Sequence, residues 1–226
     1  MPALFVDVEC SGLYRRNKPA DDPSQPWCVS IAADLRDDHG IRIPDAWFSL
    51  RIRADGRSIE PAAEAVHGIS TREARSGGVN EIAALGCLIG LVAQADVLVG
   101  HGLDFDWHVI NSLLVRRKNE TAVAAWNRPR LRRVCTMIAS TEVCQIPSET
   151  VPDTFKWPSL DEAAAQICGI EPRTGPHSPW DDVQRTAAIY FSMVRTGLLE
   201  PSEAARDITL PDDPAFGFQP LEDLVT

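Results

Sequence analysis

The segment Leu4-Phe5-Val6-Asp7-Val8-Glu9 constrains the fold of this chain more than any other. It begins as an apolar, β-prone run and then alternates acids with valine, which is typical of a buried strand that ends at a polar cleft. Because side chains alternate along a strand, Asp7 and Glu9 point to the same face. Half-buried like charges persist only when a cation or another partner compensates them. The segment therefore indicates a metal site or, as the plainer alternative, a solvated strand end.

Apolar patterns later in the chain predict further strands and helices. Strands are expected at 27–35 and 46–53, completing an antiparallel meander with the first strand, and then at 97–100 and 134–137. Helices are expected at 81–94, 107–118, 159–168 and 181–195, with shorter pieces at 62–66 and 71–74. Strands first, and alternation with helices later, predict an α/β fold with a mixed five-stranded sheet flanked by helices.

Length and composition favour one folded domain followed by a tail. The 226 residues suffice for one sizeable core, so residues 1–200 are expected to form a single domain. Residues 201–226 are acidic and rich in proline, which predicts a weakly structured tail. No apolar run approaches the roughly 20 residues that span a bilayer, and the first residues lack the basic region of a signal peptide. We therefore expect a cytoplasmic protein without a membrane partner.

The charge pattern leaves binding to nucleic acid open. The net charge of −10 argues against a general nucleic-acid coat protein but says little about a single cleft. Basic residues cluster at 15–18, 116–118 and 128–133. Each cluster is interpreted as a solvated face, with contact to phosphates as the alternative. The six cysteines contain no Cys-x-x-Cys pair, which predicts buried free thiols rather than a zinc site.

Two further segments carry residues suited to catalysis. In the segment from Val99 to Asp106 an apolar strand runs into a glycine-flanked turn and a helix start, so an acid there lies at the carboxyl end of a sheet strand. Asp106 could equally be a helix N-cap. In the segment from His177 to Asp182 a histidine, the usual proton acceptor near neutral pH, precedes two acids at a helix start. Either acid could instead be a capping residue that favours the helix dipole.

Taken together, the three segments resemble the DEDDh family of 3′→5′ exonucleases on the ribonuclease H-like fold. This group includes DnaQ-like polymerase III proofreading subunits, ribonuclease T and phage relatives. The matching segments are Asp7-Val8-Glu9-Cys10-Ser11-Gly12-Leu13, Gly100-His101-Gly102-Leu103-Asp104-Phe105-Asp106 and His177 with Asp182. The resemblance selects Asp106 over Asp104 and Asp182 over Asp181. Segments 65–70, 135–137 and 156–160 also resemble the family, while Cys10, Gly102 and Pro179 depart from its usual residues.

The resemblance implies a mechanism with two divalent metal ions, Mg²⁺ or Mn²⁺. By this similarity the metals are held by four carboxylates and the general base is a histidine; these catalytic residues are Asp7, Glu9, Asp106, Asp182 and His177. The expected reaction removes 5′-mononucleotides from nucleic-acid 3′ ends. Residues expected to hold the terminal nucleotide are Ser11, Gly12, Leu13 and His67. A plain turn is the alternative for the first three, and His67 could simply tie down its own turn.

Three alternatives share these residues or this fold. An oligoribonuclease or ribonuclease T-like enzyme would prefer RNA over DNA single strands. A docking module would bind a polymerase or repair partner through the acidic tail. A degenerate domain without metal is disfavoured because all five catalytic positions are present.

Overall fold

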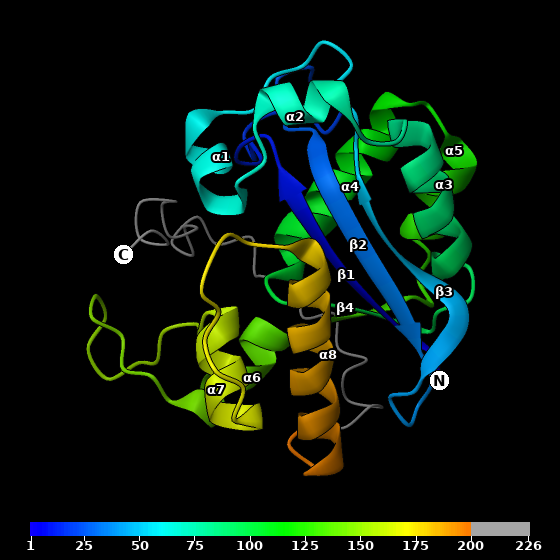
Figure 1. Ribbon diagram of the computed structural model, residues 1–226. Helices are drawn as coiled ribbons and strands as arrows, with labels where there is room; N and C mark the ends of the chain where they lie inside the picture. The colour runs from blue at the N-terminus through cyan, green and yellow to red at the C-terminus, as the bar shows by residue number, and fades with distance from the viewer. Residues whose placement is uncertain (200–226) are drawn as a thin grey trace.

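The computed structural model describes residues 1–199 and contains one mixed five-stranded sheet of order β3-β2-β1-β4-β5 (Figure 1). The strands are β1 (Ala3–Cys10), β2 (Cys28–Arg36), β3 (Arg42–Arg51), β4 (Val97–Gly100) and β5 (Arg132–Cys135). The first three strands pair antiparallel as the predicted meander, and β4 and β5 are parallel to β1. The predicted fold class is therefore confirmed.

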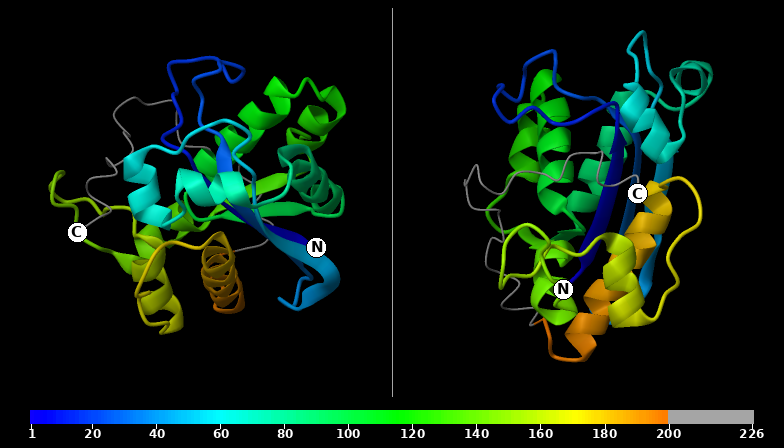
Figure 2. Two further views of the ribbon diagram at one scale, coloured as in Figure 1. Left: turned by 45° about the horizontal axis from the view of Figure 1, so that its top comes forward. Right: turned by 90° about the vertical axis from the view of Figure 1, so that its left-hand side faces the viewer.

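Helices cover both faces of the sheet (Figure 2). Their bounds are α1 (Pro61–His67), α2 (Thr71–Ser76), α3 (Glu81–Val92), α4 (Leu103–Arg116), α5 (Glu120–Trp126), α6 (Thr136–Cys144), α7 (Leu160–Cys168) and α8 (Pro179–Arg195). The alternation of β1 divides its side chains between the two layers. Val6 and Val8 pack with α3 and α4, whereas Phe5 packs with α8.

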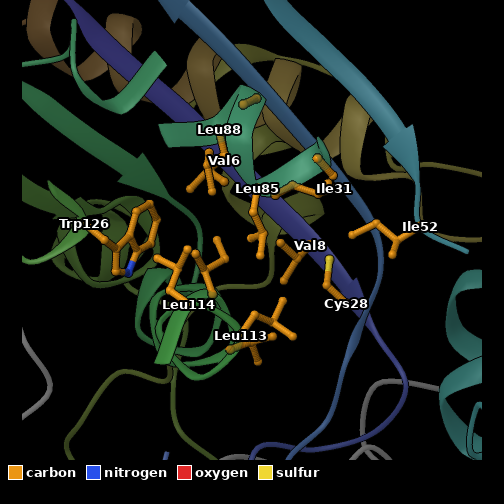
Figure 3. Packing of buried hydrophobic residues seen from close by; sticks show 14 of the residues in the cluster. Val6, Val8, Cys28, Ile31, Ile52, Leu85, Leu88, Leu113, Leu114 and Trp126 are labelled. Atoms are coloured by element: carbon orange, nitrogen blue, oxygen red, sulfur yellow. The ribbon is translucent and has the colours of Figure 1, made fainter. Parts of the chain in front are cut away.

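The larger of the two cores fills the layer beneath α3, α4 and α5 (Figure 3). Val6, Val8 and Ile31 from the sheet meet Leu88 from α3 and Leu113 from α4, and all five side chains are almost fully buried. Burial of such a side chain stabilises the fold by about 1.5–3 kcal/mol. This layer holds β1 rigidly at the end where its acids lie.

Several element boundaries differ from the sequence predictions. Residues Thr136 and Met137, predicted as the end of a strand, begin α6 instead, because the Thr136 hydroxyl is buried and bonds back to the Gly100 carbonyl at 3.3 Å. Helix α4 begins four residues earlier than predicted, directly after Gly102. The short helix α5 was not predicted. Its start is capped by Asn119, whose side chain accepts from the Ala122 N–H.

The predicted tail, residues 201–226, lies outside the described residues, as does its role in binding a polymerase or repair partner. Within residues 1–199, the six cysteines are free thiols, but the prediction that they are buried is wrong for two of them, because Cys87 is exposed and Cys168 half-buried. None of the helices in this part of the chain combines the length and apolar character needed to cross a bilayer.

Candidate active site

The end of β1 extends past its neighbour β4, and this overhang creates the site. β4 pairs only with residues Ala3 to Phe5 of β1 and ends at Gly100, so the later N–H groups on that side of β1 lack a strand partner. The Val8 N–H instead donates to Asp106 Oδ1 at 3.0 Å, from the first turn of α4. The Asp106 carboxylate is thereby fixed against the strand that carries Asp7 and Glu9.

Helix α8 brings the third predicted segment to the same place (Figure 1). Glu9, His177 and Asp182 each offer a ligand atom, and these atoms lie within 4.8 Å of one another. His177 Nδ1 is 3.6 Å from Asp182 Oδ2, and the His177 side chain remains 39% exposed while that of Asp182 is 6% exposed. The structure therefore brings the predicted histidine and its acid to the end of β1.

The acids of this cluster repel one another. Burial raises the pKa of Asp7 well above its ordinary value, and the neighbouring charges of Asp106, Asp182 and Glu9 raise it further. Burial also raises the pKa of Asp106. For Glu9, burial raises the pKa from 4.5 to about 7, although the nearby His177 opposes the shift. The cluster thus holds more negative charge than its protein surroundings neutralise.

These residues fit a divalent cation. Carboxylate oxygens are the ligands that Mg²⁺ and Mn²⁺ prefer, and the mutual repulsion of the buried carboxylates is what a bound cation would relieve. The residues that would hold such ions are Asp7, Glu9, Asp106 and Asp182.

Two acids left open by the sequence pattern lie outside the cluster. Asp104 pairs with Arg16 and lies 3.4 Å from His108, so it is engaged on the outer side of α4. Asp181 is exposed, whereas its neighbour Asp182 is buried in the cluster. The geometry thus separates Asp106 and Asp182, which the resemblance selected, from the acids beside them.

Arg173 is a member of the cluster that sequence reasoning missed. Its guanidinium forms an ion pair with Asp182 and a second one, at 3.1 Å, with Asp161 in the first turn of α7. Arg173 lies in the loop between α7 and α8, where no periodic pattern or motif marks it. No sequence signal could have found it, because its partners come from two other elements.

The remaining parts of the motifs have structural roles. His101 is half-buried between Thr136 Oγ1 and the Pro158 carbonyl, each 3.0 Å from a ring nitrogen, and desolvation of the ring lowers its pKa to about 4. A neutral ring suits this position, with one nitrogen donating to the carbonyl. His101 thereby joins the end of β4 to the start of α6 and the entry to α7.

Two of the departures from the family pattern have local explanations. Gly102 has φ of +77°, a conformation in which Gly and Asn are the preferred residues. Pro179 is the first residue of α8, where a missing N–H and a fixed φ suit proline. Neither substitution disturbs the acids of the cluster.

The predicted substrate-binding residues differ in exposure. Ser11 is buried, and its hydroxyl accepts the Trp27 N–H at 3.1 Å. Gly12 lies against Glu60 so closely that a Cβ would come 2.6 Å from the Glu60 carboxylate carbon. Leu13 is 42% exposed beside them and free to contact a ligand. Of this turn, Leu13 is the accessible side chain, while Ser11 holds the turn to the start of β2.

His67 ties down its own turn, which was the plainer of its two interpretations. It is 4% exposed, and its Nδ1 accepts the Ile69 N–H at 3.1 Å. Burial lowers the pKa of its imidazole. Contact between His67 and a substrate remains a prediction.

Two arginines of the basic clusters bind backbone carbonyls of the protein, whereas residues 15–18 are exposed. Arg116 donates to the carbonyls of Gln25 and Pro26, at 2.9 and 2.8 Å, and so pins the loop that follows Leu13 onto α4. The Arg128 guanidinium donates to the Val92 carbonyl at the end of α3 at 2.7 Å. These arginines are therefore neither plain solvated faces nor simple phosphate contacts.

Comparison with known proteins supports the architecture. No family model matches this chain, and no curated protein matches its sequence. The fold is similar to that of a zinc-bound E. coli exonuclease I complex with single-stranded DNA, with a TM-score of 0.66 and 22% identity over 87% of this chain and 42% of that chain. A product-bound exonuclease I gives a TM-score of 0.64 and 22% identity, covering 87% and 44% of the two chains.

A further exonuclease I structure, described as suggesting how processivity is achieved, has a TM-score of 0.68 at 21% identity and covers 87% of this chain and 42% of that chain. The present chain thus spans about two fifths of the length of the exonuclease I chains that it matches. The likeness establishes that this chain has the ribonuclease H-like exonuclease fold, with its mixed five-stranded sheet and flanking helices.

Proposed function

We propose that this protein is a metal-dependent 3′→5′ exonuclease that hydrolyses single-stranded nucleic acid and releases 5′-mononucleotides. The convergence of Asp7, Glu9, Asp106 and Asp182 at the end of β1, with His177 beside them, carries the proposal. The direction of cleavage rests on the resemblance of the three segments to DEDDh exonucleases. The E. coli exonuclease I structures of the same fold include complexes with dT13 and dA16 oligonucleotides, which supports a single-stranded DNA substrate.

The four carboxylates would hold two divalent ions, Mg²⁺ or Mn²⁺. When bound, such ions lower the pKa of water and stabilise charge on the oxygens of a phosphodiester. The protein supplies a rigid frame for this chemistry, because β1 is packed between two helical layers and Asp106 is bonded to the β1 backbone.

His177 has the geometry of a general base. Its Nδ1 faces Asp182, which orients the ring, and its 39% exposed side chain can reach a water molecule at the mouth of the cluster. The backbone N–H of His177 also donates to the Val66 carbonyl at 3.2 Å, so the loop between α7 and α8 is fixed at this residue. His177 would therefore accept the proton of the attacking water.

The 3′-terminal nucleotide would lie over the turn 11–13. Leu13 offers an exposed apolar side chain that can pack against a base, whereas the space beside Gly12 is taken by the Glu60 carboxylate. RNA is the alternative substrate, and contacts to the 2′-hydroxyl would distinguish it from DNA.

The test is release of mononucleotides from 3′- and 5′-labelled single-stranded DNA and RNA of equal sequence. Each reaction contains Mg²⁺, Mn²⁺ or EDTA, and wild type is compared with Asp182→Ala and His177→Ala. We expect metal-dependent trimming from the 3′ end, with a loss of rate of at least about 100-fold in each variant. Asp181→Ala is the matched control, because Asp181 is an exposed acid next to Asp182.

The assay separates the alternatives. A preference for the RNA strand would identify the ribonuclease T-like function. Trimming from the 5′ end, or activity that survives EDTA or both substitutions, would contradict the proposal.

A further inference from the structure

Arg173 is shared between a carboxylate of the site and one outside it. Its Nη1 pairs with Asp182, a proposed metal ligand, and its Nε lies 3.1 Å from Asp161 Oδ2. The Arg173 side chain is 15% exposed, so its charge is largely withdrawn from water. A buried guanidinium of this kind is retained where carboxylates compensate it.

Asp161 is held in place independently of Arg173. Arg185, on α8, lies 3.3 Å from Asp161 Oδ1 and also donates to the Glu171 carbonyl at 3.0 Å. Asp161 would therefore remain a fixed acceptor if the guanidinium of Arg173 left Asp182.

The loop that carries Arg173 is anchored on its other side. The His177 N–H bonds to the Val66 carbonyl, and Pro176 packs against Gly68, where a Cβ would come 3.2 Å from the Pro176 Cβ. Between Arg173 and this anchor lies Gly175, with φ of +129° and open space around it. A shift of Arg173 can thus be absorbed at Gly175 without moving His177.

A guanidinium and a divalent ion compete for the same carboxylate. Arg173 neutralises part of a cluster whose other acids repel one another, and a cation bound at Asp182 would lie beside a like charge. We propose that Arg173 is a built-in counter-cation: it occupies Asp182 when no divalent ion is bound and moves onto Asp161 alone when a metal takes its place. This inference rests on the metal site of the proposed function.

The arrangement sets the affinity for metal. Each binding event must break the Arg173–Asp182 pair, so Arg173 weakens metal binding while it stabilises the metal-free chain. Arg173→Met should therefore bind Mn²⁺ roughly tenfold more tightly than wild type and unfold at a lower temperature in EDTA. Asp161→Asn should have the opposite effect on affinity, because the displaced guanidinium loses its acceptor.

The experiment is calorimetric titration of the full chain with Mn²⁺, combined with thermal unfolding in EDTA and in saturating Mn²⁺. Arg36→Met is the matched control, because Arg36 is 17% exposed, forms an ion pair with a buried acid and lies outside the cluster. Its Mn²⁺ affinity should stay within about twofold of wild type, although its unfolding temperature falls. Asp182→Asn should lose most of the binding.

Distinct outcomes overturn the inference and the proposed function. If Arg173→Met binds Mn²⁺ no more tightly than wild type while Asp182→Asn loses binding, the counter-cation role of Arg173 is refuted. The proposed metal site is then still supported. An equal increase in Mn²⁺ affinity in Arg36→Met would show a general effect of removing positive charge, and this outcome would also overturn the inference about Arg173. If neither wild type nor Arg173→Met binds Mn²⁺, both the inference and the metal-dependent function fail.

Discussion

Buried acids on neighbouring strands of this sheet have opposite surroundings. Asp34 on β2 is 0% exposed and accepts hydrogen bonds from Arg36, Arg42 and Gln184 at 2.9 to 3.1 Å. Glu9 on β1 is 8% exposed, and among the described residues its close neighbours include Asp182 rather than a bonded arginine. A fully compensated buried acid stabilises the structure, whereas a group of acids that a single arginine compensates only in part marks a place where a further positive charge can bind.

Glu81 gives a second compensated example. It is 2% exposed at the start of α3 and accepts from Arg57 and Arg117. Burial would raise the pKa of its carboxyl, but the two guanidinium groups outweigh burial and lower it. For Glu9, burial prevails and the pKa rises to about 7.

The largest expected change in the free energy of unfolding comes from removing the two arginines that pair with Asp34. The double substitution Arg36→Met and Arg42→Met leaves a buried charge with only Gln184, so the free energy of unfolding should fall by about 3 kcal/mol. Urea denaturation measures the loss. Arg53→Met, which removes a salt bridge of an exposed pair, should change stability by less than about 1 kcal/mol. Similar losses in both proteins would contradict the role assigned to burial.

The next effect is expected at Glu81. Glu81→Gln removes the charge from a site with two guanidinium partners and should lower the free energy of unfolding by about 1.5–3 kcal/mol. The same denaturation experiment at pH 8 in EDTA measures it. A neutral or stabilising result would show that the ion pairs do not repay the desolvation of Glu81.

Glu9→Gln should have the opposite sign. At pH 8 in EDTA the ionised Glu9 carries the cost of its burial and the repulsion of Asp182, so replacing it with the neutral amide should stabilise the fold by about 1–2 kcal/mol. In saturating Mn²⁺ wild type should instead be more stable than Glu9→Gln, because wild type gains binding energy that the variant lacks. Destabilisation in EDTA would mean that the carboxylate already has a compensating partner.

The smallest expected effect is the pH dependence of the stability that Glu9→Gln gains over wild type in EDTA. Since the pKa of Glu9 rises from 4.5 to about 7 on folding, the folded protein binds more protons than the unfolded chain between these values. The penalty for burying Glu9 is therefore complete above pH 7 and disappears as the pH falls towards 4.5. The stability difference between Glu9→Gln and wild type should shrink to less than about 0.5 kcal/mol at pH 4.5. A constant difference from pH 4.5 to 8 would contradict the shift.

The sequence predicted most of the fold because its strongest elements have clear periodicity and end signals. Ser159, predicted as a helix cap, accepts from the Glu162 N–H in a capping box at the start of α7. Helix α5 was missed because only seven residues carry its pattern. The end of β5 was misplaced because Thr136 is turned into α6 by contacts with β4, which local propensity does not encode.

From the sequence alone, alternation along one strand pairs Asp7 with Glu9, and the resemblance to the DEDDh family selects Asp106, Asp182 and His177 as the residues predicted to act with them. Only the tertiary structure decided what surrounds them. Arg173 and Asp161 reach the cluster from a loop and another helix, and Asp34 receives its arginines across β2 and β3. Charge compensation depends on distances of a few ångströms between segments far apart in the chain, and such distances follow from packing rather than from any local pattern.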